Sequence, residues 1–220
     1  FSDSVSNAYS EKALVERATL EVLEALGWKV GNAERETVGD GATFGRESFS
    51  DVVLPARVRS AVARLNPDVP MEAREAAIEE LVRDRTAMGA AAANREVHRL
   101  LSEGAKRRVQ DPRTGQEVTQ TVRFIDWEGE QNEWLALSQM KFRGPLYTCI
   151  PDVVLFVNGL PWVMIELKRP GVAARQAFDD NLTSYKHPQN GVPKLLAFHA
   201  FSIASMFPFQ MEGVKSSSSA

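Results

Sequence analysis

The chain has 220 residues, of which 44% are hydrophobic, so it is long enough to bury a substantial core in one large domain. No stretch reaches the roughly 18 uncharged apolar residues of a membrane-spanning helix, and the N-terminus lacks a basic segment followed by an apolar one. The net charge of −3 argues against a broad basic surface that grips nucleic acid unaided, and the single cysteine, Cys149, excludes an internal disulfide or a cysteine-built zinc site. We therefore expect a cytoplasmic protein that does not enter a membrane.

The first half of the chain, about residues 10–104, has a helical pattern. Ser10 can cap a helix that ends at Gly27, because apolar residues between them recur every three or four positions. Three more helices are predicted, and they cover about 54–65, 71–88 and 94–103.

The second half, about residues 105–200, has the pattern of a sheet. Residues 106–127 predict a hairpin with its turn at 111–115, and further strands are expected at 133–142 and, twice, within 151–168. A helix over about 172–185 and a last strand at "KLLAFHA", 194–200, follow. Helices ahead of a mostly antiparallel sheet, with one helical crossover, predict an α+β (mixed α/β) fold. We expect it to form one domain over 1–206, with 207–220 as a disordered tail.

The stretch "PDVVLFVNGLPWVMIELKRPG", 151–171, is apolar except at its ends. Asp152 precedes the first of its strands, and Glu166 and Lys168 share one face of the second, because alternate residues of a strand point the same way. Two carboxylates and a backbone carbonyl, that of Leu167, form an oxygen site of the kind Mg²⁺ accepts. A lysine beside them can orient a water or neutralise charge at a phosphate, which predicts phosphodiester hydrolysis. The same pattern also fits a hairpin whose charged ends are merely solvated.

A metal site here sets a condition on the hairpin. A regular four-residue loop would put Asp152 opposite Leu167, and a two-residue Asn-Gly turn would put it opposite Ile165. In both registers Asp152 lies on the face of the sheet away from Glu166. The metal site therefore predicts a β-bulge or an odd-length loop.

These residues resemble the PD-(D/E)XK nuclease motif in the N-terminal domain of type I restriction enzyme R subunits, the HsdR family. The resemblance continues through "LNPDVPMEAREAAIEEL", "IDWEGEQNEWLALSQMKF" and "NLTSYKHPQNGVPKLLAFHA", and its most specific element is "FVNGLPWVMIELK". It implies a restriction-endonuclease-like core that hydrolyses DNA with Mg²⁺, for which Mn²⁺ can substitute. It also implies that Asp152 and Glu166 are metal ligands and that Lys168 is the catalytic lysine.

The chain departs from the family pattern at two places near the motif. The family usually has Gln-x-x-x-Tyr on the helix after the motif, and this chain has Asn181 and Tyr185 instead. Asn keeps the amide but shortens its reach by one methylene, so an accessory role of Asn181 and an ordinary exposed position both stay open. Ile150 stands where the family often has Arg before the Pro-Asp pair.

Other charged residues are candidates of lower rank. A Glu on the first helix sometimes completes the metal site in the wider superfamily, which makes Glu16 a candidate, although a boundary Glu that reaches water or pairs with Lys12 is favoured. Arg169, Arg175 and Lys186 flank the motif and could contact DNA phosphates, but basic residues at such places are most often solvated.

The partners follow from the same resemblance. Family members continue into two helicase-like motor domains, whereas this chain has no G-x-x-x-x-G-K-[ST] loop and thus no ATP site of that kind. The resemblance implies that the chain acts on DNA with those motor domains and with methyltransferase and specificity subunits, which hold the DNA. We therefore expect the chain alone to cut DNA poorly. Two alternatives are a non-catalytic docking domain on the same fold and a standalone repair-type DNA nuclease.

Overall fold

The computed structural model describes residues 2–111, 113–167 and 192–205. The helices are α1 Ser2–Ala25, α2 Pro55–Leu65, α3 Met71–Val82, α4 Ala90–Glu103 and α7 Pro193–Phe198. The strands are β1 Lys29–Asn32, β2 Ala105–Gln110, β3 Glu117–Val122, β4 Trp134–Ser138, β5 Phe142–Arg143, β6 Thr148–Cys149, β7 Val153–Val157, β8 Leu160–Leu167 and β9 Phe201–Ser205. The predicted α+β class is confirmed. Within these ranges, no helix carries an apolar stretch long enough to cross a bilayer.

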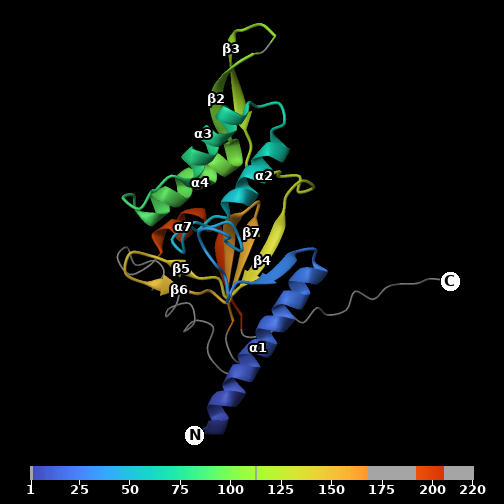
Figure 1. Cartoon of the computed structure of the whole chain (residues 1–220), viewed down its shortest axis with the longest axis vertical. Helices are drawn as coiled ribbons and strands as arrows, with labels where there is room; N and C mark the ends of the chain where they lie inside the picture. Colours follow the sequence, from blue (N-terminus) through green and yellow to red (C-terminus); the bar gives the residue numbers. More distant parts are fainter. Residues whose placement is uncertain (1, 112, 168–191, 206–220) are drawn as a thin grey trace, which may run out of the picture.

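A five-stranded sheet with the order β1-β4-β7-β8-β9 forms the centre of the fold. Its inner pairs, β4–β7 and β7–β8, are antiparallel, and its edge pairs, β1–β4 and β8–β9, are parallel. Strands β2–β3 and β5–β6 form separate antiparallel hairpins. Figure 1 shows β2–β3 projecting at the end of the molecule opposite the start of α1, and β5–β6 beside the lower end of the sheet.

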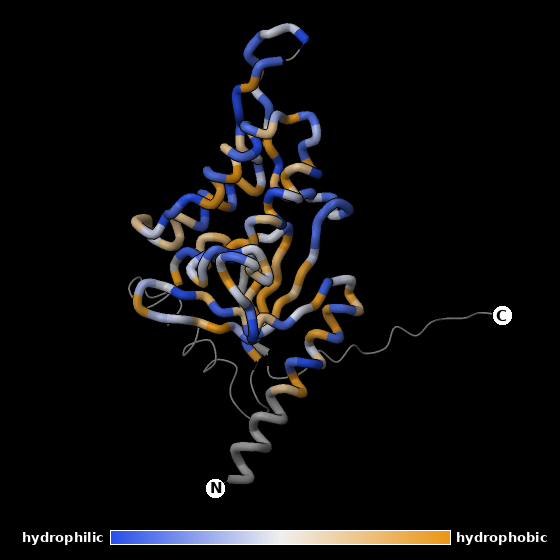
Figure 2. Tube along the Cα trace, viewed as in Figure 1, coloured by the Kyte–Doolittle hydropathy of each residue, from blue (hydrophilic) through white to orange (hydrophobic). Residues whose placement is uncertain are grey.

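Helices cover both faces of the sheet. Along β7, Val153 and Leu155 belong to the core that α1 covers, whereas Val154 and Phe156 belong to the larger core formed with α2, α3, α4 and α7. This alternation follows from the two-residue period of a strand. Figure 2 shows hydrophobic residues following the central strands, which lie between the two helical layers.

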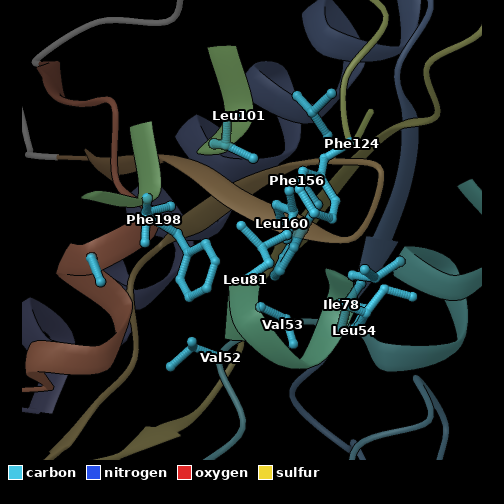
Figure 3. Packing of buried hydrophobic residues seen from close by; sticks show 14 of the residues in the cluster. Val52, Val53, Leu54, Ile78, Leu81, Leu101, Phe124, Phe156, Leu160 and Phe198 are labelled. Carbon is cyan, nitrogen blue, oxygen red and sulfur yellow. The ribbon is translucent and has the colours of Figure 1, made fainter. Parts of the chain in front are cut away.

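The larger core joins the sheet to the helices that lie before and after it in the sequence. Phe156 and Leu160 of the central hairpin lie in the same cluster as Leu81 of α3 and Phe198 of α7, as Figure 3 shows. Each of these side chains is at most 6% exposed. Burying a side chain of this size contributes about 1.5–3 kcal/mol, so this packing holds the hairpin firmly between the helices.

Two expectations about secondary structure were wrong. "KLLAFHA" forms helix α7, and the last strand is β9, which follows it. Pro193 stands in the first turn of α7, where its missing N–H costs nothing, and so short an apolar run has no period that separates strand from helix. The region expected to be all helical contains β1, a short strand that pairs in parallel with β4.

The other elements predicted within the described residues are present with shifted ends. Helix α1 begins at Ser2 rather than Ser10, and α3 ends at Val82, well before residue 88. The hairpin turn at 111–115 is confirmed, because Gly115 N–H donates to the Asp111 carbonyl at 2.8 Å. The helix expected over 172–185 and the tail at 207–220 lie outside the described residues.

Candidate active site

The β7–β8 hairpin brings the two motif carboxylates to one face of the sheet. Its strands join through a two-residue Asn-Gly turn, and the register then shifts so that Trp162 is an extra residue on β8. Beyond this bulge the strands pair as far as Val153 and Ile165, and the next position sets Asp152 opposite Glu166. The bulge that a metal site demands is therefore present.

The Asn-Gly turn is fixed by its own side chain and by its surroundings. Asn158 and Gly159 have φ angles of 54° and 81°, as a type I′ turn requires. The buried Asn158 amide accepts a hydrogen bond from Glu133 N–H at 2.8 Å and donates to the Phe124 carbonyl at 2.9 Å. A Cβ at Gly159 would lie 2.8 Å from the Leu54 carbonyl oxygen. The turn thus locks the register of the whole hairpin.

Asp152 and Glu166 are buried and face each other closely. Their exposed fractions are 3% and 4%. The Asp152 carbonyl accepts a hydrogen bond of 3.1 Å from Gln139 N–H, so the backbone groups of Asp152 point towards β4 and away from β8. Asp152 and Glu166 are then a non-hydrogen-bonded pair, the kind in which side chains come closest, with Cβ atoms about 4.5–5.5 Å apart.

The backbone of Leu167 lies beside the same carboxylates. The Leu167 N–H donates to Asp152 Oδ2 at 2.7 Å, and Pro151 has no N–H that could occupy the Leu167 carbonyl. Since the N–H and C=O of a strand residue point to the same neighbour, the Leu167 carbonyl is also directed towards Asp152. Three oxygen donors therefore gather at one edge of the sheet.

This donor set fits a hard divalent cation. In the described part of the chain, no group of three or more His, Cys, Asp or Glu side chains is arranged to hold a metal ion. A cation at Asp152 and Glu166 would thus complete its shell with a backbone carbonyl, water and substrate oxygens. Mg²⁺ is usually held in this way, by one or two carboxylates and several waters.

Cys149 is a neighbour of the site that the sequence did not indicate. Its thiol is buried, and burial, followed by the negative charge of Glu166, raises its pKa to about 12. The Cys149 thiol is thus sensitive to the charge of Glu166. The available signal was that Cys149 comes three residues before Asp152.

Glu16 reaches the same end of the sheet from the opposite face. It accepts a hydrogen bond from the side chain of Gln139, whose N–H is bonded to the Asp152 carbonyl. The partner expected for it, Lys12, has a side chain outside the described residues. A role of Glu16 in holding a metal stays a prediction.

Several candidate residues fall where the structure gives no description. The catalytic lysine, the accessory pair and the basic residues expected at DNA lie within 168–191, and they are Lys168, Asn181, Tyr185, Arg169, Arg175 and Lys186. Their roles stay predictions.

Residues 8–207 match the family model of the type I restriction enzyme R protein N terminus. The chain belongs to this family. The resemblance noted in the sequence is thereby confirmed.

Curated relatives support the same family. The chain is 34% identical over 161 residues to the type I restriction enzyme HindI endonuclease subunit of Haemophilus influenzae, which covers 71% of this chain and 15% of that protein. It is 26% identical over 212 residues to the putative type I restriction enzyme MjaIXP endonuclease subunit of Methanocaldococcus jannaschii. These residues cover 89% of this chain and 18% of that protein. The chain thus spans less than a fifth of the length of these relatives.

Proposed function

We propose that the chain is the nuclease domain of a type I restriction enzyme R subunit and hydrolyses DNA phosphodiester bonds with a divalent cation. The observation that carries this proposal is the buried pair of Asp152 and Glu166, which the bulge at Trp162 brings to one face. Solvated hairpin ends would not need a bulge, a buried location or a backbone donor for the aspartate. Membership of the family and the relatives named as endonuclease subunits point to the same chemistry.

Each residue of the proposed active site has its own role in metal binding or catalysis. Asp152, Glu166 and the Leu167 carbonyl would hold Mg²⁺, with Mn²⁺ as a substitute. When bound, the cation supplies charge stabilisation at the phosphate and makes a bound water more acidic. The Leu167 N–H fixes one oxygen of Asp152, so that carboxylate is oriented before substrate arrives. Lys168 follows Glu166 by two residues and is the proposed catalytic lysine.

The remaining candidates support this centre. Glu16 stays the less favoured candidate for a third carboxylate, because among the described residues no third acidic side chain is grouped with Asp152 and Glu166. Asn181 with Tyr185 would act as the accessory pair. Arg169, Arg175 and Lys186 would contact DNA, as proposed from the sequence. We place these residues in one nuclease domain over 1–206.

The proposed setting is a cytoplasmic complex. Its DNA is held by motor domains of the full R subunit and by methyltransferase and specificity subunits, and ATP is bound outside this chain. The net charge of −3 supports this division, because few phosphate contacts are available for independent binding.

The test pairs thermal melting with cleavage. Asp152→Asn keeps an oxygen that can accept the Leu167 N–H, so the metal-free chain should melt near wild type. It should lose the stabilisation that Mg²⁺ or Mn²⁺ gives wild type, and an R subunit that carries it should not cleave DNA in the reconstituted complex. Lys168→Ala should keep the stabilisation by metal and lose cleavage. Asp68→Asn, at an exposed loop position, is the matched control for the lost charge.

Two results would favour the alternatives. A complex with Asp152→Asn that cleaves DNA at the wild-type rate would leave a docking domain as the better explanation. Efficient cutting of plain duplex DNA by the purified chain, without ATP or other subunits, would instead indicate a standalone nuclease.

A further inference from the structure

We propose that the β5–β6 hairpin is a DNA-backbone contact beside the active site, in which Lys141 and Arg143 bind phosphates of the strand to be cut. This inference rests on the proposed function, because the hairpin has a substrate to hold only if Asp152 and Glu166 act on DNA.

The hairpin is tied to both carboxylates. The Gln139 N–H donates to the Asp152 carbonyl at 3.1 Å, and Lys141 follows Gln139 by two residues. Strand β6 ends at Cys149, three residues before Asp152. The pairs Phe142–Cys149 and Arg143–Thr148 define the hairpin, and Figure 1 shows it running sideways from the lower end of the sheet. Lys141 and Arg143 follow Gln139 by two and four residues, so at about 3.3 Å per residue they lie at most roughly 7–13 Å from the position bonded to Asp152. That span corresponds to about two to four nucleotide steps of 3.4 Å each.

Lys141, which directly precedes β5, and Arg143 on β5 are held in place, and no carboxylate of the described residues neutralises them. Lys141 and Arg143 flank the fully buried Phe142 and thus share the opposite face of the strand. Lys141 Nζ lies 5.0 Å and Arg143 Cζ 5.8 Å from the centre of the Phe49 ring. Among the described residues, no carboxylate pairs with either of them, whereas Arg57 pairs with a glutamate. A ring attracts a cation without cancelling its charge, so both remain able to bind phosphate.

A buried ion pair fixes the hairpin to the loop before α2. Arg46 donates to the Lys141 carbonyl at 2.9 Å, and Arg143 N–H donates to the Phe49 carbonyl at 2.8 Å. Arg46 also makes a bidentate contact with Glu36, so its own charge is already balanced. The frame therefore positions Lys141 and Arg143 before DNA binds.

Exposed apolar residues at and near the tip of the hairpin suggest a protein as the alternative partner. Leu146, Tyr147 and Ile150 are 73%, 61% and 45% exposed, and apolar side chains of this kind also suit a protein surface. A protein seated there would cover the edge at which Asp152 and Glu166 must meet a phosphate. Two uncancelled cations next to a phosphate-cleaving pair favour DNA, against which Tyr147 can stack on a base.

The experiment measures binding apart from cleavage. Fluorescence anisotropy of a short labelled DNA duplex in EDTA would compare the wild-type chain with Lys141→Gln/Arg143→Gln at several salt concentrations. Losing two phosphate contacts should weaken binding by roughly ten-fold or more at 0.1 M salt and reduce the slope of log K against log[salt] by about 2. Arg143→Lys should keep the wild-type slope. The matched control, Arg95→Gln/Lys106→Gln, removes the same charge at exposed positions on α4 and β2 and should change binding by less than about three-fold.

Several outcomes would overturn the inference. They are an unchanged slope in the hairpin variant, an equal loss in the control, and a wild-type chain that binds no DNA at low salt. Retained DNA binding with lost association to the rest of the R subunit, supplied in trans, would make the hairpin a protein interface. Glutamine keeps part of the aliphatic stem and the backbone anchors are untouched, so melting near wild type checks folding.

Failure of the two proposals can be told apart. If Asp152→Asn leaves cleavage intact while the hairpin variant loses DNA binding, the nuclease proposal fails and the hairpin contact stands. If Asp152→Asn abolishes cleavage while the hairpin variant binds normally, the reverse holds.

Discussion

Replacing Arg46 with Met removes a guanidinium that is 0% exposed and leaves its partner, Glu36, at 1% exposure with no counter-charge. Arg46 contacts both oxygens of Glu36 and donates to the Asp51 and Lys141 carbonyls at 2.6 and 2.9 Å. Breaking a buried pair by deleting one member costs about 3–5 kcal/mol, because the remaining charge stays buried. Each carbonyl that loses its donor adds about 1 kcal/mol.

A loss of about 5 kcal/mol is a large share of the roughly 5–15 kcal/mol that stabilises a domain. For a chain of this size, each kcal/mol lowers the melting temperature by about 2–4 °C, so Arg46→Met should melt about 10–20 °C below wild type. The measurement is calorimetry together with chemical denaturation. Amide exchange over residues 141–149 should also quicken, since Arg46 anchors that hairpin.

Two control variants sharpen the test. Arg59 pairs with Glu75 at 58% and 41% exposure, so Arg59→Met should cost less than about 1 kcal/mol. The double variant Glu36→Leu/Arg46→Met removes both charges and should recover most of the loss. If Arg46→Met cost no more than Arg59→Met, or if the double variant were no more stable than the single one, the assignment of this pair as an anchor would be refuted.

Two further predictions concern the turn and the buried thiol. Gly159→Ala should destabilise the chain by roughly 2 kcal/mol or more in thermal melts, because its φ is 81° and its Cβ would meet the Leu54 carbonyl at 2.8 Å. Gly129→Ala, at φ 92° with no atom within 4 Å, should cost about 1 kcal/mol, and an equal loss at both sites would contradict the steric argument. The folded pKa of Cys149, about 12, lies above its ordinary value of 9.0, so its contribution to stability is complete below pH 9 and is lost as pH rises towards 12. The difference in free energy of unfolding between wild type and Cys149→Ala should therefore shrink over that interval. Glu166→Gln should lower the pKa of the thiol, which the pH dependence of its alkylation measures. An unaltered pH profile of alkylation would place Glu166 away from Cys149.

The site was easier to predict than the fold around it. Its main requirement is that Asp152 and Glu166 share one face of the sheet, and strand geometry allows only two arrangements. A strand has a period of two, so Asp152 lies either on the face of Glu166 or on the other face. The sequence predicted that an irregularity must correct the register. Its location at Trp162 could not be predicted, since it depends on distant contacts. The Trp162 ring packs 5.8 Å from Trp127, and its carbonyl accepts a hydrogen bond from Ala200 N–H at 2.8 Å.

Structural features that leave no periodic pattern in the sequence could not be predicted from it. Glu36 and Arg46 lie in an irregular segment in which no pattern marks two charges as buried partners. The sequence predicted a strand at 194–200, but the structure has helix α7 there and strand β9 after it. Seven mostly apolar residues bounded by proline fit the period of a helix and that of a strand equally well. The proximity of Cys149 to Glu166 depends on how β6 folds back on β5, which is set by tertiary packing.

The local charge of the β5–β6 hairpin and the acidic balance of the whole chain are compatible for a physical reason. Phosphate contacts have two effects, since they supply affinity and they fix the register of the DNA on the protein. Affinity sums over many contacts and can come from other domains, whereas register must be set next to the reacting bond. In the proposed contact, two cations held on one ring follow Gln139, whose N–H is bonded to Asp152. They are too few to bind DNA tightly but sufficient to align a scissile phosphate. A nuclease domain within a larger DNA-binding assembly therefore needs such a local contact even when its net charge is negative.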